Sequence, residues 1–176
     1  MLQNVWNTGK INLDRNKNNK LDYILIEGEQ THFDAVRRTN GFLENSQNLP
    51  LNQLTNLSAD WQRDLASMKF SKLDTSIIQS AEAIICNNDD MALGAWEALE
   101  EKGCTEVQVV GIDGIEEVRE LVDEDKILGS VLCDTKLHAK ALMQFIDVLA
   151  FHNGSVEKLN LENERYYMIP LTKVEK

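Results

Sequence analysis

The sequence predicts an α/β fold, a doubly wound and mostly parallel sheet with helices on both faces. From residue 22 onward, apolar runs of strand length alternate with longer amphipathic segments. This alternation is typical of βα units, in which successive strands run parallel and each helix crosses over the sheet. Hydrophobic residues make up 43% of the 176 positions, which is enough apolar side chain to bury a core.

The expected elements follow one another in regular order. Each apolar run is short and suits a strand that is buried on both faces, and each following segment has the 3.6-residue period of a helix. The expected strands are Tyr23–Ile26, Leu54–Leu57, Ala83–Cys86, Val107–Ile112 and Leu128–Leu132. The expected helices are Phe33–Glu44, Asp60–Lys69, Asp89–Lys102, Ile115–Asp123 and Thr135–Asn153.

Composition excludes several classes of function. The formal net charge of −11 disfavours nucleic acid and anionic membrane surfaces as partners, because both would repel this chain. No apolar stretch reaches the roughly 18 residues of a membrane span. The first ten residues lack the charged and apolar regions of a secretory signal peptide. The three cysteines, at 86, 104 and 133, are scattered and do not indicate a disulfide framework.

Polar residues of a consistent kind follow the expected strands, where ligands of parallel α/β sheets bind. They are His32, Asp34 and Arg38 after the first run, Asp60 and Trp61 after the second, Asn87, Asn88 and Asp89 after the third, and Asp113 after the fourth. Polyhydroxylated ligands need planar donors and acceptors together with an aromatic face, so this set suggests a sugar. The alternative for a single residue is a helix N-cap, since Asp34, Asp60 and Asp89 stand where helices begin.

Residues 14–22 raise a separate question, whether they form a metal site or a solvated turn. Asp14, Asn16, Asn18, Lys20 and Asp22 take the first, third, fifth, seventh and ninth places of an EF-hand-like calcium loop. The seventh place needs only a backbone carbonyl, so Lys20 is acceptable there. The twelfth place needs a bidentate carboxylate but is Leu25, so the EF-hand pattern fails on its own terms. Asn19, at the sharp turn, tolerates a positive φ better than most residues.

With these segments in place, the chain resembles the periplasmic galactose/glucose-binding proteins of bacterial ABC transport and chemotaxis. The resemblance is carried in order by LDRNKNNKLDYILIEGE, HFDAVRR, ADWQ, ICNNDDMALGAWEAL, VVGIDG and GSVLCDT. It implies one lobe of a type I periplasmic-binding-protein fold, a two-lobed fold with a sugar in the cleft. The matching begins in the middle of that fold, so most of the N-terminal lobe has no counterpart here.

The resemblance implies specific roles for the residues of the sugar site. His32, Asp34 and Arg38 match the family's hydrogen-bonding His-x-Asp-x-x-x-Arg stretch. Trp61 matches the stacking tryptophan, Asn88 the asparagine of the NND turn, and Asp113 the aspartate after the following strand. The family's next contact is an asparagine, and Cys133 stands in that place. A thiol is a poor substitute for an amide, so affinity or sugar preference should differ from the family norm.

The resemblance also implies a closing ligand for residues 14–22. The family closes its calcium loop with a glutamate from a remote strand, and the match is Glu82. Asp14, Asp22 and Glu82 would give the first shell about three negative charges, which suits a hard cation such as calcium. Calcium is therefore the expected cofactor, with a solvated Asx-rich turn as the alternative.

The family's organisation implies three segments. Residues 1–134 would form the C-terminal sugar-binding lobe, 135–167 would cross to the N-terminal lobe, and 168–176 would return. The expected partners are a monosaccharide, an ABC permease for the full-length receptor, and either the missing lobe or a second copy through helix 135–153. The expected location is periplasmic or extracellular, where a lipid anchor is a further option.

Two other functions compete with a transport receptor. The effector-binding core of a sugar-responsive repressor of the LacI type shares the superfamily fold, but the metal loop and the lack of a basic DNA-binding segment count against it. An enzyme using His32 and Asp34 as acid and base would need a second catalytic group, and the sequence offers none of the right type. We therefore expect a binding protein and no catalytic residues.

Overall fold

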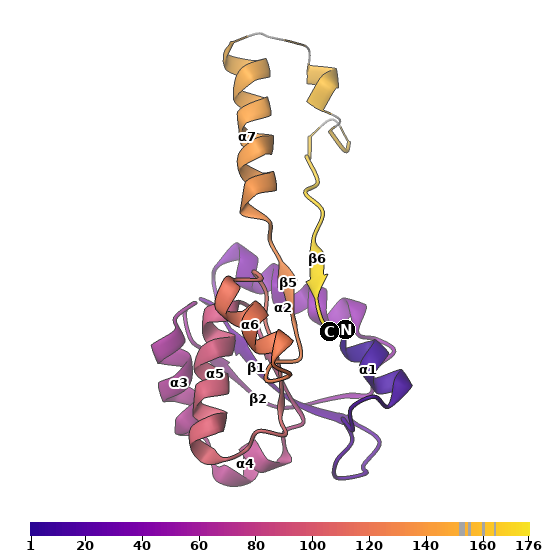
Figure 1. Ribbon diagram of the computed structural model, residues 1–176, viewed down its shortest axis with the longest axis vertical. Helices are drawn as coiled ribbons and strands as arrows, with labels where there is room; N and C mark the ends of the chain where they lie inside the picture. Colours follow the sequence, from indigo (N-terminus) through magenta and orange to yellow (C-terminus); the bar gives the residue numbers. More distant parts are fainter. Residues whose placement is uncertain (152–153, 155, 160, 164) are drawn as a thin grey trace.

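The computed structural model describes residues 1–151, 154, 156–159, 161–163 and 165–176. It confirms the predicted α/β class and shows a parallel sheet flanked by helices, from which one helix and a returning segment project (Figure 1). We call this projection the arm, residues 135–171 as far as they are described, and the rest the body. Both ends of the chain lie in the body, close together (Figure 1).

The sheet has strand order β2-β1-β3-β4, and all its strands are parallel. Its members are β1 (Leu21–Glu27), β2 (Leu51–Ser58), β3 (Ala83–Cys86) and β4 (Gln108–Val110). β5 (Ser130–Leu132) lies beside β4, and isolated parallel bridges at the ends of the two strands join them. β6 (Thr172–Val174) pairs antiparallel with β5 where the arm returns. Taken together, the four-stranded sheet and the β5–β6 pair are mostly parallel, with β6 as the antiparallel strand at the edge.

Two cores cover the two faces of the sheet. Successive side chains of β1 alternate between them, because a strand points neighbouring residues to opposite sides. Ile24 and Ile26 pack with α3 (Arg63–Ser71), α4 (Thr75–Ser80), α5 (Asp89–Lys102) and α6 (Glu116–Asp123). Tyr23 and Leu25 pack on the other side with α1 (Leu2–Thr8) and with Phe42 of α2 (Phe33–Asn45). A strand buried on both faces explains why the run reads as continuously apolar.

Some boundaries differ from the sequence prediction. The helix expected from Asp60 begins at Arg63, because Asp60 and Trp61 adopt left-handed backbone conformations with φ of 49° and 69°. The alternative interpretation of Asp34, Asp60 and Asp89 as N-caps is wrong, since His32, Gln62 and Asn88 occupy the N-cap positions. The short elements α1, α4 and β6 carry too few residues for a periodic signal.

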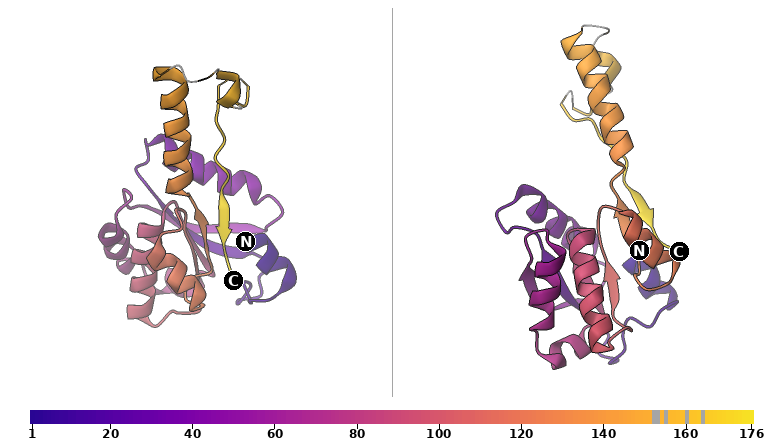
Figure 2. Two further views of the ribbon diagram at one scale, coloured as in Figure 1. Left: turned by 45° about the horizontal axis from the view of Figure 1, so that its top comes forward. Right: turned by 60° about the vertical axis from the view of Figure 1, so that its left-hand side comes forward.

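The arm consists of α7 (Thr135–Ala150), a 3₁₀ turn (Val156–Leu159) and the segment that returns to β6. Residues 152 and 153 of the expected helix lie outside the described residues. The stripe Leu137, Ala141, Leu142, Phe145, Val148 and Leu149 has the period of a buried face, which in the resembled family packs on the N-terminal lobe. In the structure only Ala141 of this stripe is buried. The reason is that α7 stands away from the sheet (Figure 2). It packs against the returning segment instead, where Phe145 meets Tyr167 edge to face. None of the helices in the described part of the chain is long and apolar enough to cross a membrane.

Candidate functional site

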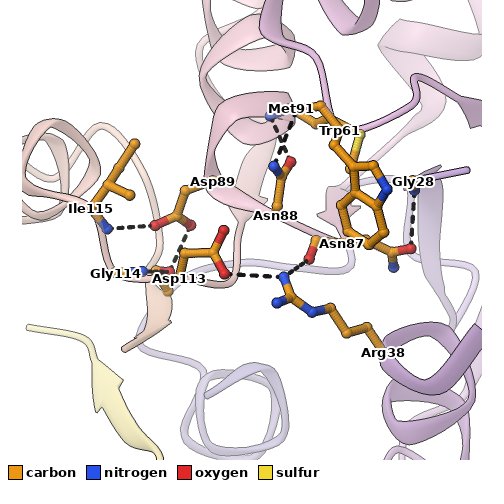
Figure 3. A network of polar contacts seen from close by, with 11 residues as sticks. Gly28, Arg38, Trp61, Asn87, Asn88, Asp89, Met91, Asp113, Gly114 and Ile115 are labelled. Carbon is orange, nitrogen blue, oxygen red and sulfur yellow. Dashed lines mark hydrogen bonds and ion pairs between the residues drawn. The ribbon is translucent and has the colours of Figure 1, made fainter. Parts of the chain in front are cut away.

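The candidate site lies beyond the carboxyl ends of β1, β3 and β4, where Figure 3 shows Arg38, Trp61, Asn87, Asn88 and Asp113 close together. Arg38 comes from α2 and reaches across this edge. Its Nη1 donates to Asp113 Oδ1 at 3.1 Å and to the Asn87 carbonyl at 2.6 Å. Its guanidinium carbon lies 5.5 Å from the centre of the Trp61 ring. A cation, a carboxylate and an indole therefore meet at one place, as a hydroxylated ligand requires.

His32 also contacts the Trp61 indole. Its ring centre is 5.3 Å from that of Trp61, in an edge-to-face arrangement. Nδ1 accepts the Asp34 backbone N–H at 3.2 Å and so caps α2. When Nδ1 accepts, the neutral ring carries its proton on Nε2, which is then a donor for a ligand. The Asp34 side chain is exposed in the first turn of α2.

Asn88 combines the two roles that the sequence left open, a helix N-cap and a group available to a ligand. Its Oδ1 accepts the Met91 N–H at 3.0 Å and caps α5, while its Nδ2 donates to the Trp61 carbonyl at 3.2 Å (Figure 3). One proton of the amide remains for a ligand. A single side chain thus begins the helix and fixes the backbone that carries the indole.

Asp113 and Cys133 form the opposite wall. Asp113 has a φ of 133°, a conformation that side chains rarely adopt, and its carbonyl accepts the Cys133 N–H at 3.0 Å. Burial raises the pKa of Asp113, although the charge of Arg38 opposes the shift. Burial also raises the pKa of the Cys133 thiol, and the charge of Asp113 adds to the effect. At neutral pH Cys133 is therefore a neutral thiol beside a carboxylate.

Three buried residues support these groups: Asn87 and Asp89, which were among the polar residues expected after the strands, and Ser130, which was not assigned to the site from the sequence. Asn87 is 2% exposed; its Oδ1 accepts the Gly28 N–H at 3.2 Å, and its Nδ2 donates to Thr39. Asp89 and Ser130 are fully buried and hold the turn that carries Asp113. The run of two amides and two carboxylates at 87–90 was the available signal, because so many polar groups after one strand exceed what a single cap needs.

An apolar cavity of about 590 Å³ adjoins Arg38, Asn87 and Cys133 on the α1 and α2 side of the sheet. Phe42, Leu49, Ile85, Val110 and Leu171 are among its lining residues. The helices on this face therefore leave part of the sheet uncovered next to the site.

The segment 14–22 folds into a tight loop whose side chains bind its own backbone. Asp14 accepts the N–H groups of Asn18 and Asn19 at 2.9 and 3.1 Å, and Asn18 Oδ1 accepts from Lys20 at 2.8 Å. Asn16 and Asn18 both direct Nδ2 to Asp22 Oδ2, at 2.7 and 2.8 Å. Asn19 has a φ of 59°, as expected for the sharp turn.

Glu82 closes this loop from the start of β3. The residue is 1% exposed, and its carboxylate accepts backbone N–H groups from Arg15, Asn16 and Asp22. Burial raises the pKa of Glu82, against the effect of these hydrogen bonds. Burial would also raise the pKa of Asp22, but hydrogen bonds from Asn52, Asn16 and Asn18 outweigh it and leave that pKa lowered.

The donor set is chemically suited to calcium. Asp14, Asp22 and Glu82 supply hard carboxylate oxygens, and rotating the amides of Asn16 and Asn18 would direct oxygen instead of nitrogen toward Asp22. The oxygen and nitrogen of an asparagine amide have nearly the same shape, so the two orientations fill the same space. Among the described residues, no group of three His, Cys, Asp or Glu side chains converges closely enough to hold a metal by itself. The two asparagines and the Lys20 carbonyl are therefore needed to complete the shell.

The fold and this site define an α/β lobe with a cluster of polar groups and an indole at the carboxyl edge of a parallel sheet. The chain belongs to the periplasmic binding protein domain family, which it matches over residues 11–153. It is 33% identical over 168 residues to the D-galactose/methyl-galactoside binding periplasmic protein MglB of Haemophilus influenzae, covering 93% of this chain and 50% of that protein. It is 32% identical over 115 residues to the D-allose-binding periplasmic protein of Escherichia coli, covering 62% of this chain and 36% of that protein.

Solved structures show the same fold. A solute-binding protein of an ABC transporter from Bacillus halodurans, with bound myo-inositol, superposes with a TM-score of 0.70 and 26% identity, over 92% of this chain and 54% of that one. Another from Actinobacillus succinogenes, with bound D-allose, gives a TM-score of 0.73 and 22% identity over 93% and 55%. The chain thus spans about half the length of these relatives, which are binding proteins and not enzymes.

Proposed function

We propose that this chain is the C-terminal sugar-binding lobe of a galactose- or glucose-type solute receptor for ABC transport or sugar sensing. The observation that carries the proposal is the convergence of Arg38, Asp113 and Trp61 at the carboxyl ends of the strands. A guanidinium can donate to two adjacent hydroxyls, a carboxylate accepts from them, and an indole covers an apolar sugar face. The relatives named for galactose and allose support the same ligand class.

The receptor proposal includes the location and the further partners. The periplasmic relatives support a periplasmic or extracellular site of action, with an ABC permease as partner of the complete receptor. A repressor core of the same superfamily is the alternative, and the net charge of −11 weighs against association with DNA.

The arm supports a second lobe as the protein partner. Leu142, Met143 and Leu149 are more than half exposed on α7, and isolated apolar patches of this kind mark interaction surfaces. Because the chain spans about half the length of its relatives, we infer that the other lobe of a two-lobed receptor covers this face.

We also propose calcium as the cofactor of the loop 14–22 and Glu82. The support is the geometry of that loop, in which Asp14 holds two backbone N–H groups and two asparagine side chains converge on Asp22. The ion would offset two of the three negative charges of Asp14, Asp22 and Glu82 and hold residues 14–22 against the start of β3.

The sugar proposal is tested by titrating the ¹⁵N-labelled chain with glucose and with galactose while recording amide NMR spectra. A single lobe offers one wall of the cleft, so we expect saturable shifts with a Kd in the millimolar range. Asp113→Asn removes the acceptor charge at the site and should weaken binding by about tenfold, which corresponds to about 1.4 kcal/mol.

Asp123→Asn is the matched control, because Asp123 is an exposed aspartate at the end of α6 outside the site. It should bind as the unaltered chain does. Shifts that fail to saturate, or equal binding by the two variants, would contradict the proposal.

A further inference from the structure

Gly28, which follows β1, lies against the Trp61 indole (Figure 3). A Cβ built on Gly28 would lie 2.6 Å from Trp61 Cδ2 and closer still to Cε2 and Cζ2. Carbon atoms in contact are normally 3.5–4.0 Å apart, so even a methyl group does not fit. The backbone itself is ordinary, because Gly28 is not among the glycines with positive φ. Its small size, and not its backbone freedom, is therefore what the site uses.

Neither side of this contact can move away at low cost. The Gly28 N–H is bound by Asn87 Oδ1 at 3.2 Å, and its carbonyl accepts from Ser58 Oγ at 3.0 Å. On the other side, Asn88 Nδ2 holds the Trp61 carbonyl at 3.2 Å, and the left-handed φ of 69° fixes the direction in which the side chain leaves the backbone. An added methyl group would thus displace the indole from its position beside Arg38 and His32.

We propose that Gly28 is a positioning residue of the sugar site, which provides the space that seats the Trp61 indole. This inference rests on the proposed sugar-binding function, and it adds a residue that touches the indole and not the ligand. The consequence is that Gly28→Ala should impair sugar binding although alanine suits the backbone.

The first experiment compares Gly28→Ala with Gly41→Ala. Gly41 is a good control because it lies within α2, has no positive φ, and leaves an added methyl group with nothing within 4 Å. The tryptophan side chains at 6, 61 and 96 are labelled with ¹⁵N, and the indole N–H resonance of Trp61 is assigned with Trp61→Phe. We expect Gly28→Ala to move the Trp61 resonance alone and to raise the Kd for glucose or galactose at least tenfold. Gly41→Ala should leave both unchanged.

A double-mutant cycle distinguishes a specific contact between Gly28 and the Trp61 indole from a general effect of Gly28→Ala on folding. Melting temperatures are measured for the unaltered chain, Gly28→Ala, Trp61→Ala and the double variant. If Gly28 makes room for the indole, Gly28→Ala lowers the melting temperature only when Trp61 is present. An equal loss in both backgrounds would overturn the proposal, even if Gly28→Ala is too unstable for titration.

The outcomes also distinguish this inference from the proposed function. An unaltered chain that binds neither sugar overturns the proposed function and, with it, the role of Gly28 in sugar binding. Sugar binding by the unaltered chain and equally by Gly28→Ala, with an unmoved Trp61 resonance, overturns the role of Gly28 alone.

Discussion

Ser130 donates from Oγ to Asp89 Oδ1 at 2.7 Å, joining two buried residues that are 41 positions apart in the sequence. The other Asp89 oxygen accepts the Ile115 N–H at 2.9 Å, and Ser130 Oγ accepts the Gly114 N–H at 3.2 Å. These bonds fix the turn that follows β4, where Asp113 adopts its unusual φ. The pair therefore connects the start of α5 and the strand β5 to the acidic wall of the site.

Ser130→Ala is expected to destabilise the chain by about 1–3 kcal/mol, because it leaves the Gly114 N–H buried without its acceptor and removes a donor from Asp89. Urea unfolding followed by circular dichroism measures the change. Ser80→Ala is the control, since the Ser80 hydroxyl is exposed on α4 and its loss should stay within about 0.5 kcal/mol. Equal midpoints for the two variants would disprove a structural role of this pair.

Calcium is expected to raise the melting temperature of the chelator-treated chain, because its site exists only in the folded state. Binding to the folded state alone stabilises by about 2.7 kcal/mol when calcium is present at one hundred times its Kd. Asp14→Asn keeps an oxygen that can accept from Asn18 but loses one charge, so its calcium response should be smaller. Differential scanning calorimetry with and without millimolar calcium tests this, and an unmoved transition would rule out the metal site.

Cys133→Asn is expected to tighten sugar binding. The substitution places an amide with two donors and an acceptor where the thiol now lies next to Asp113. One or two new hydrogen bonds at about 1 kcal/mol each would lower the Kd by about tenfold. Isothermal titration with galactose and glucose measures it, with Cys133→Ser as the control that adds a hydroxyl of nearly the thiol's size. A Kd equal to that of the unaltered chain would exclude position 133 from the ligand contacts.

The alkylation of Cys133 should depend on pH in a way that reports its raised pKa. Because burial raises this pKa above the ordinary 9.0, the reactive thiolate forms only at higher pH. The rate of reaction with iodoacetamide, followed by mass spectrometry, should therefore reach half of its maximum only above pH 9.0, which is the midpoint for an unperturbed thiol. Bound sugar should slow the reaction, and a rate that levels off below that pH would contradict the assignment.

The isolated chain is expected to self-associate through the arm at micromolar concentrations, since its exposed apolar face has no second lobe to cover it. Leu142 is 62% exposed, and Leu142→Asp places a charge in the middle of that face. Light scattering should show a lower mass for Leu142→Asp than for the unaltered chain, with the sugar response unchanged. Gln144→Asp is the control, because it adds the same charge at a position that is already polar and exposed.

The sequence pattern predicted the sheet because the middle of β1 and the whole of β3 are buried on both faces and therefore apolar. It did not predict α1, α4 or β6, which are short and owe their conformations to packing and pairing with distant residues. The exposure of α7 was implied by the resemblance, in which this helix packs on the N-terminal lobe, and not by its sequence period. Its apolar period is that of a buried helix, and the period does not indicate whether the covering surface belongs to the same chain.

The polar groups that line the site were predictable because they follow the strands directly. The supporting roles of Gly28, Asn87 and Ser130 were not predictable, since these residues act through contacts between residues far apart in the chain. A glycine in a sequence gives no sign that its missing side chain makes room for an indole. Likewise, the sequence does not distinguish an asparagine that binds a ligand from one that holds the backbone of its neighbours.

β1 runs between the two proposed sites, with Asp22 of the calcium loop near its start and Gly28 just past its end. Its first six residues are buried, and the strand is hydrogen-bonded to β2 on one side and to β3 on the other. At about 3.3 Å per residue, such a strand separates the sites by roughly 20 Å. Because β1 is buried and paired on both sides, it has no second conformation that calcium or sugar could select. Allosteric coupling requires such a second conformation. The free energies of binding at the two proposed sites should therefore simply add, so that the sugar affinity stays the same with or without calcium.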